Sequence, residues 1–199
     1  DGDNVLKTKG AIHYLTSEQI ENNKEYLFSI SDKLKNGNII SLIIGGPTQY
    51  YDYSDRNIQE IFSKVNFLVK ENNLSLVVIP SMRTPKETIE HAKIYFGNDH
   101  LVLDTVDKKA YLSALSISKY IVVTCDSSSM ISEAALTGKP IYIAAIPPKK
   151  NDKRFKNFRK LFHEMKIVRE LGEKLENWSY EKLDETNRIA NIIRDKIQL

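Results

Sequence analysis

The chain has 199 residues, of which 41% are hydrophobic and 28% charged, and its net charge at neutral pH is +3. This length can bury a full hydrophobic core, and the composition is ordinary for a soluble globular protein. The small net charge does not indicate a specific nucleic-acid-binding surface, and no apolar run approaches the roughly 18 residues that a membrane span needs.

The first 35 residues divide into an irregular part and a helical part. Residues 1–16 are predicted to form a lead-in segment with one short strand around Val5. The pair Thr16 and Gln19 has the spacing of a capping box, in which each residue satisfies a backbone N–H of the other. Apolar residues at helical spacing follow, so a helix is predicted over 17–35.

The rest of the chain alternates apolar, β-branched runs with stretches of helical periodicity. The runs predict strands and the periodic stretches predict helices. In chain order, the predicted elements are a strand at 39–44, a helix at 55–72, a strand at 74–80, a helix at 86–95, a strand at 100–103, a helix at 108–118, a strand at 120–124, a helix that begins after Asp126 and ends at Gly138, a strand at 141–145, a helix at 155–165, a sixth strand at 167–168 and, within the terminal segment 181–199, a helix at 181–198.

This alternation predicts an α/β fold, namely a Rossmann-like, doubly wound parallel sheet of about six strands with helices on both faces. Residues 1–199 contain no internal repeat and no low-complexity linker, so a single domain is the simplest organisation. Ligands of such sheets bind outside the carboxyl ends of the strands, where the strand order reverses. Candidate functional residues are therefore those in the loops that follow the strands.

Two of these loops carry residues suited to phosphate. The first core strand is followed by Gly45, Gly46, Pro47 and Thr48, and paired glycines let a backbone approach a bulky anion, although they equally suit a tight turn. The second strand is followed by Arg83, whose planar donor fork matches phosphate, although a single surface arginine is usually only a solvated charge. No dinucleotide fingerprint and no P-loop motif is present.

The third loop follows the fourth strand, where Asp126, Ser127, Ser128 and Ser129 are all favourable N-cap residues. A helix N-terminus exposes unpaired N–H groups, which attract anions. Glu133 comes about one turn later and is placed to accept hydrogen bonds from two ribose hydroxyls. Helix capping alone explains this loop, but three such loops at one sheet edge predict a phosphate-recognising cleft.

Other chemistry is weakly indicated. The four histidines show no metal-ligand spacing, so no metal site is predicted. The serines at 127–129 lack the G-x-S-x-G pattern of a hydrolase nucleophile, and Asp104 and Asp107 suit capping better than general acid–base work. The lysine-rich loop at 149–154 is ordinarily a solvated surface, but because it follows a strand end it is also placed to lie over a ligand's base or phosphates.

The compartment is indicated by cysteine usage and by the first residues. Cys125 is the only cysteine, which excludes a disulfide framework and fits a reducing compartment. The sequence begins Asp1-Gly2-Asp3-Asn4, which lacks both a signal-peptide pattern and an initiator methionine. We therefore expect a cytoplasmic protein of which this chain is a fragment or a processed product.

The pattern over residues 39–143 resembles the nucleotide-binding half of GT-B-type glycosyltransferases. In that half, a strand, a Ser-rich turn and a helix ending in E-A-x-x-x-G-K-P hold the nucleotide-sugar donor. The corresponding run here is Glu133-Ala134-Ala135-Leu136-Thr137-Gly138-Lys139-Pro140.

More narrowly, nearly the whole chain is similar to the mitochondrial-fission "elongated mitochondria" family, which also occurs in bacteria. The matching motifs are Asn4-Val5, Gly10-Ala11-Ile12-His13, Gly45-Gly46-Pro47, Ser81-x-Arg83-Thr84-Pro85, the run from Val123 to Ala134, and Thr137-Gly138-Lys139-Pro140. The resemblance implies that residues 45–48 and 127–129 contact the pyrophosphate of a donor and that Glu133 contacts its ribose.

The resemblance also implies a longer protein, in which an N-terminal acceptor-type domain precedes this donor half and supplies the catalytic base. No catalytic residue is therefore assigned to residues 1–199. Two positions depart from the expected pattern, because Gln49 and Met82 stand where basic residues are expected beside a phosphate. The core loops contain no D-x-D carboxylate pair to hold a metal against a diphosphate, which favours a metal-independent reaction, and the resemblance suggests an inverting one.

The leading hypothesis is a domain that binds a UDP-type nucleotide sugar as the donor of a glycosyltransferase, with an unknown acceptor and no cofactor. A second hypothesis is a non-catalytic protein-interaction module on the same fold, for which peripheral contact with a membrane stays open. A third is an enzyme that modifies nucleotide sugars, such as an epimerase, against which the missing dinucleotide fingerprint argues.

Overall fold

The computed structural model describes residues 2, 4–34 and 37–197. Its centre is a sheet of six parallel strands in the order β3-β2-β1-β4-β5-β6. In chain order the strands are β1 (Ile39–Ile44), β2 (Ser75–Pro80), β3 (Leu101–Val102), β4 (Tyr120–Thr124), β5 (Ile141–Ala144) and β6 (Val168–Glu170). The predicted doubly wound α/β fold is therefore confirmed, including the sixth strand.

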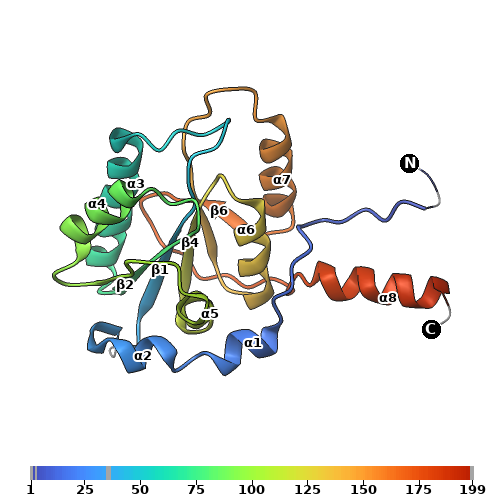
Figure 1. Ribbon diagram of the computed structural model, residues 1–199, viewed down its shortest axis with the longest axis horizontal. Helices are drawn as coiled ribbons and strands as arrows, with labels where there is room; N and C mark the ends of the chain where they lie inside the picture. Colours follow the sequence, from blue (N-terminus) through green and yellow to red (C-terminus); the bar gives the residue numbers. More distant parts are fainter. Residues whose placement is uncertain (1, 3, 35–36, 198–199) are drawn as a thin grey trace.

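Helices cover both faces of this sheet (Figure 1). The main helices are α3 (Asp55–Glu71), α4 (Lys86–Phe96), α5 (Lys108–Ile117), α6 (Ser128–Ala134), α7 (Lys153–Glu164) and α8 (Glu185–Ile197). Right-handed crossovers place the helices that follow β1 and β2 on one face, and those that follow β3 and β4 on the other. Accordingly α3 packs against α4, while α5 packs against the short N-terminal helices α1 (Ser17–Asn22) and α2 (Tyr26–Ile30).

The predicted helix over 17–35 is wrong, because the chain breaks into α1, α2 and a 3-10 turn, η1 (Asp32–Leu34), and residue 35 lies outside the described residues. The capping box at Thr16 and Gln19 is present as predicted. The break is held by a side chain from α5, since Ser113 Oγ donates to the Lys24 carbonyl (2.8 Å) and accepts from the Leu27 N–H (3.1 Å). A distant hydroxyl thus replaces hydrogen bonds that a continuous helix would make.

Two predictions at the chain ends also need correction. Val5 is in no strand, and its N–H donates to the Gly2 carbonyl in a turn. The terminal helix begins at Glu185 rather than at 181, because the Asp184 carboxylate accepts from the Asn187 N–H (3.0 Å) and so caps a later first turn. The predicted last residue, 198, lies outside the described part.

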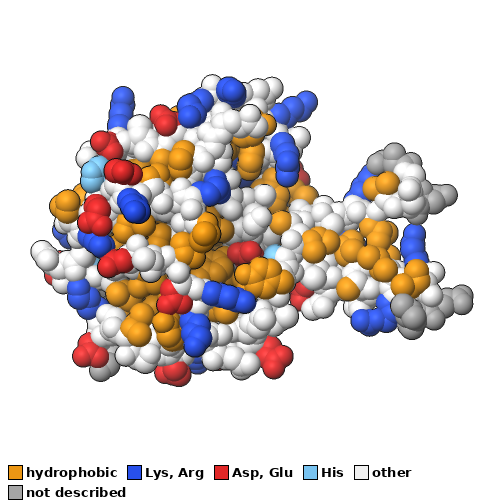
Figure 2. All heavy atoms as spheres, in the orientation of Figure 1, with side chains coloured by type: hydrophobic (Ala, Val, Ile, Leu, Met, Phe, Trp, Pro, Cys, Tyr) orange, Lys and Arg blue, Asp and Glu red, His pale blue; other side chains and the backbone are white. Residues whose placement is uncertain are grey.

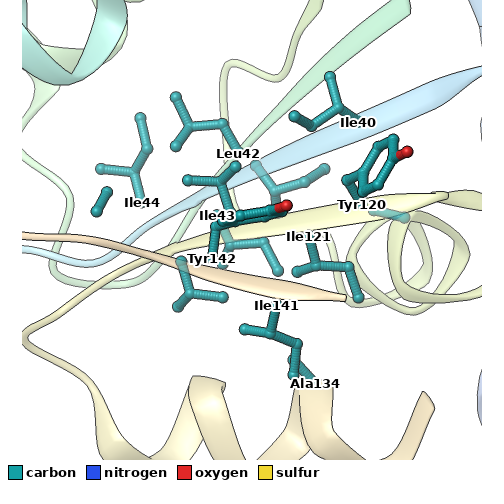
Figure 3. Close-up of a cluster of buried hydrophobic side chains, with 14 of the residues drawn as sticks. Ile40, Leu42, Ile43, Ile44, Tyr120, Ile121, Ala134, Ile141 and Tyr142 are labelled. Atoms are coloured by element: carbon teal, nitrogen blue, oxygen red, sulfur yellow. The ribbon is translucent and has the colours of Figure 1, made fainter. Parts of the chain in front are cut away.

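The core lies between β1, β4, β5 and the helices that flank them (Figure 3). Ile43, Ile121 and Ile141 are almost completely buried, and Ala134 of α6 points toward the strands. The three central strands β1, β4 and β5 are buried at every position, which explains why they read as continuous apolar runs.

The N-terminal segment and α8 project together from the body of the domain (Figure 1). They are joined by hydrogen bonds from the Lys9 N–H to Glu185 (2.7 Å) and between Thr186 Oγ1 and the His13 carbonyl (2.7 Å). Apolar side chains gather on this projection in the space-filling view (Figure 2). None of the described helices has the length and apolar character needed to cross a membrane.

Lys139, in the Gly-Lys-Pro segment before β5, caps the end of α5. Its ammonium donates to the carbonyls of Leu115 (3.0 Å) and Ser116, which are unpaired acceptors at the helix C-terminus. We expect Lys139→Met to lower the free energy of unfolding by about 1 kcal/mol, because it leaves both carbonyls without their donor. The charge itself adds no stability, since burial lowers the pKa of Lys139 to about 8 and so disfavours the ammonium form. Urea unfolding measures this, with Lys160→Met, a change to an exposed lysine, as the control; an equal effect of both variants would contradict the capping role.

Candidate functional site

The three predicted loops meet at the carboxyl edge of the sheet. They follow β2, β1 and β4, which are neighbours in the strand order. Thr84 Oγ1, in the loop after β2, donates to the carbonyls of Ile44 (2.8 Å) and Gly45 (2.7 Å) in the loop after β1. The Gly46 N–H donates to Asp126 (3.2 Å) in the loop after β4. The prediction that these loops share one edge is therefore confirmed.

Asp126 is the centre of this junction. Its side chain is completely buried and accepts from the Tyr53 hydroxyl (2.6 Å) as well as from Gly46. It also forms an ion pair with Arg83 at 2.7 Å. Arg83 donates a second hydrogen bond to the Gly46 carbonyl (3.0 Å), so its guanidinium ties all three loops together while 42% of the side chain stays exposed.

The paired glycines are required by how closely these loops pack. A Cβ atom on Gly45 would lie 2.2 Å from Asp126 Oδ2, and one on Gly46 would lie 1.9 Å from the Arg83 carbonyl oxygen. Both glycines have negative φ, so close approach rather than unusual backbone conformation explains them. Thr48 lies beyond the junction, where its hydroxyl accepts from the N–H groups of Tyr50 and Tyr51 (both 3.1 Å) and closes a local turn.

The serine turn begins α6 as predicted. Ser127 is the N-cap and accepts from the Met130 N–H (3.4 Å), while Ser128 is half-buried and Ser129 is exposed. The helix runs on into a 3-10 turn, η2 (Ala135–Thr137), and ends at Gly138 with φ of +72°, a left-handed conformation that glycine adopts readily.

Glu133, near the end of α6, lines a cavity of about 190 Å³. Its carboxylate accepts from the Tyr111 hydroxyl of α5 at 2.6 Å. Burial raises the pKa of Glu133 above its ordinary value, while the Tyr111 hydrogen bond and the charge of His13 partly oppose the shift. Burial also raises the pKa of Tyr111, and the neighbouring carboxylate adds to the shift, so the phenol stays protonated and remains a donor.

The cavity walls are mainly apolar and come from separate elements. Met82 follows β2, Val106 precedes α5, and Tyr14 comes from the N-terminal segment. These side chains are 86%, 49% and 69% exposed, respectively. Such a cavity suits a ligand that has both a flat ring and hydroxyl groups. The exposed apolar rim can contact the ring, and the half-buried carboxylate can accept hydrogen bonds from the hydroxyls.

The structure thus separates the predicted site residues into groups. Gly45, Gly46 and Arg83 are joined through Asp126, whereas Glu133 lines its own cavity and Thr48 closes a turn. The predictions missed Tyr53 and Tyr111, and they took Asp126 only as a possible cap. A carboxylate two residues after a buried strand, as Asp126 is after β4, is a usable sign of such a junction, but nothing in the sequence marks the two tyrosines. Within the described ranges, no group of three or more His, Cys, Asp or Glu side chains could hold a metal ion.

A Rossmann-like parallel sheet with this strand order is the architecture of one domain of GT-B-like proteins. A family model described as Mitochondrial fission ELM1 matches residues 1–197, and the chain belongs to this family. An uncharacterized protein of Rickettsia prowazekii is 32% identical over 80% of the chain and 47% of its own length. Mitochondrial fission protein ELM1 of Arabidopsis thaliana is 27% identical over 98% of the chain and 46% of its length.

Among solved structures, the S. aureus MnaA–UDP co-structure is similar, with a TM-score of 0.50, 17% identity, and coverage of 85% of this chain and 49% of that one. UDP-GlcNAc 2-epimerase from Neisseria meningitidis, bound to UDP-GlcNAc, has a TM-score of 0.48, 14% identity, and coverage of 92% and 42%. At these identities the similarity concerns the fold. The chain spans about half the length of the curated relatives it matches.

Proposed function

We propose that this domain binds a nucleoside diphosphate sugar of the UDP type and serves as the donor half of a GT-B-like glycosyltransferase. The observation that carries the proposal is Glu133, whose carboxylate is half-buried in a cavity at the carboxyl edge of the sheet. In the described part of the chain, its hydrogen-bond partner is Tyr111. A carboxylate has about four lone-pair positions, so capacity remains for two ribose hydroxyls.

The walls of the cavity suit the base of the same nucleotide. Met82 and Val106 are large exposed apolar side chains, and covering them with a flat ring removes apolar surface from water. Tyr14 lies at the same cavity, and the Lys108 ammonium is 4.7 Å from the centre of its ring, which holds the ring in place. In this proposal the base contacts the apolar walls of the cavity, and the ribose hydroxyls donate hydrogen bonds to the Glu133 carboxylate.

The activity of the whole protein requires more than this domain. We propose that a second, acceptor-type domain supplies the catalytic base, as the resemblance to GT-B-type glycosyltransferases implies and as the greater length of the curated relatives allows. The projecting α8 offers a surface for such a domain, because its Ile193 and Ile197 are 44% and 57% exposed and apolar side chains gather on this projection (Figure 2). Apolar side chains grouped on a projecting helix mark a contact surface more often than a solvated one.

Calorimetric titration of the chain tests the donor-site proposal. We expect UDP and UDP sugars to bind, with uridine binding more weakly because it lacks the phosphates. UDP at about 100 times its dissociation constant should add about 2.7 kcal/mol of stability in a thermal-shift experiment, provided that it binds only the folded chain. Absence of both heat and thermal shift with uridine, UDP and UDP sugars would overturn the proposal.

A further inference from the structure

Positive charge is concentrated in one short part of the chain. Residues 149–160 include seven lysines and arginines and a single acidic residue, Asp152, although the whole chain carries a net charge of only +3. The Asp152 side chain is 1% exposed and is engaged by Tyr51 (2.7 Å) and Arg159 (3.3 Å). The surface at the start of α7 is therefore strongly cationic, with its one carboxylate turned inward.

Part of this cationic surface faces a second cavity, of about 240 Å³. We call it the α6–α7 cavity, because its wall includes Ser128 at the start of α6, Arg154, Phe155 and Phe158 of α7, and the N-terminal segment at Lys9. The cavity that holds Glu133 includes Met130 of the same short helix. The two cavities therefore lie beside successive parts of α6.

The walls of the α6–α7 cavity are held in place by specific contacts. The Ala11 N–H donates to Ser132 Oγ (2.9 Å), which fixes the N-terminal segment against α6. Gly10 permits this approach, since a Cβ there would lie 2.9 Å from the same oxygen. Phe155 packs edge-on against Tyr51, with ring centres 5.5 Å apart, which fixes the start of α7. The position of Arg154 is thus set by an ordered scaffold.

The cations at this cavity differ from Arg83 in what they already bind. Arg83 is paired with the buried Asp126, so much of its charge is compensated within the protein. Within the part of the chain that the structure describes, neither Arg154 nor Lys9 forms an ion pair, and both side chains are exposed. The Lys9 charge also acts on Glu185 and helps to lower the pKa of that carboxyl, so Arg154 is the less compensated of the two. A ligand that carries negative charge gains more from these two cations than from Arg83.

We propose that the α6–α7 cavity binds an oxyanion, and that this oxyanion is the diphosphate of the nucleotide whose nucleoside contacts Glu133. The second part rests on the proposed function. Arg154 supplies a bidentate donor to the phosphate oxygens, Lys9 supplies a second positive charge, and Ser128 supplies a hydroxyl at the same cavity. The charge of the diphosphate is therefore compensated by α7 and the N-terminal segment, rather than by the loop that carries Arg83.

The test titrates the whole chain with UDP, uridine and inorganic pyrophosphate. We expect Arg154→Gln to weaken UDP and pyrophosphate binding about tenfold and Lys9→Gln to weaken both by a smaller factor, while uridine binding changes by less than about twofold. The matched control is Lys153→Gln, which removes an equal charge from the neighbouring residue of α7, one that is exposed and does not line the cavity. The control should leave all three affinities unchanged within about twofold.

The outcomes separate this inference from the donor-site proposal. UDP that binds equally well to the wild type and to Arg154→Gln would overturn the assignment of the cavity and leave the donor site standing. An equal loss in Lys153→Gln would show attraction to surface charge in general and would also overturn it. Arg154-dependent binding of pyrophosphate without any binding of UDP or uridine would support the oxyanion site and overturn the nucleotide as its ligand.

Discussion

The substitution Asp126→Ala is expected to lower the free energy of unfolding by about 3 kcal/mol or more. The carboxylate is fully buried and accepts from Gly46, Tyr53 and Arg83. Its removal leaves the buried Gly46 N–H without this acceptor and the Arg83 cation without its counter-charge, while the Tyr53 hydroxyl keeps only its contact with Thr124 Oγ1 (2.9 Å). The three loops at the carboxyl edge are joined through this side chain, so their relative positions should loosen as well. Urea unfolding at neutral pH measures the change.

A matched control is Asp104→Ala, which removes an aspartate from an ion pair of similar length, 2.8 Å to Lys93, but with 67% of the side chain exposed. Surface pairs contribute little, so we expect less than about 1 kcal/mol for this variant. Tyr53→Phe should cost about 1 kcal/mol, because it removes one donor and leaves the ion pair intact. Similar losses for Asp126→Ala and Asp104→Ala would contradict the role of Asp126 as the centre of the junction.

The strands could be predicted because their environment is uniform. The run at 39–44 coincides with β1, which is buried at all six positions and flanked by β2 and β4. A segment surrounded by apolar side chains on both faces must itself be apolar along its length, and this leaves a continuous pattern. The alternation of such runs with amphipathic helices is then enough to predict a parallel, doubly wound sheet and the edge at which the loops meet.

The misses share a different cause, which is contact between residues far apart in the chain. The break between α1 and α2 depends on Ser113, almost 90 positions beyond it, and no local pattern reveals that contact. The role of Arg83 as a phosphate ligand stays a prediction, but no local pattern reveals that its guanidinium pairs with Asp126, 43 positions away. Local spacing in the sequence indicates on which element a side chain lies. Its hydrogen-bond or ion-pair partner depends on which distant elements pack against that element.

Glu133→Gln is expected to weaken UDP binding by about 10- to 100-fold and, unlike Asp126→Ala, to stabilise the folded chain at neutral pH. Glutamine keeps an acceptor for Tyr111 but lacks the charge that strengthens hydrogen bonds from ribose hydroxyls by about 1.5–3 kcal/mol. Burial raises the pKa of Glu133 in the folded state, so the ionised form is disfavoured there. The neutral variant is relieved of that cost.

The sign of the pH dependence follows from the direction of this pKa shift. Between the unfolded value, near 4.5, and the raised folded value, the folded chain binds more protons than the unfolded chain. The contribution of Glu133 to stability therefore falls as pH rises through this interval, and its cost is complete above the folded pKa. The stability advantage of Glu133→Gln should be largest at neutral pH and should shrink as the pH approaches 4.5, which thermal unfolding at a series of pH values measures.

Binding should show the opposite trend with pH, because the ribose requires the ionised carboxylate. Wild-type affinity for UDP should fall on acidification at a pH above the ordinary range of a glutamate, and Tyr111→Phe should move this fall to higher pH, since the Tyr111 hydrogen bond lowers the pKa of Glu133. Glu164→Gln, a change to an exposed glutamate of α7, should alter neither stability nor binding appreciably. Undiminished UDP binding by Glu133→Gln would show that Glu133 does not bind the ribose. A loss of stability in that variant would show instead that the charged carboxylate stabilises the fold.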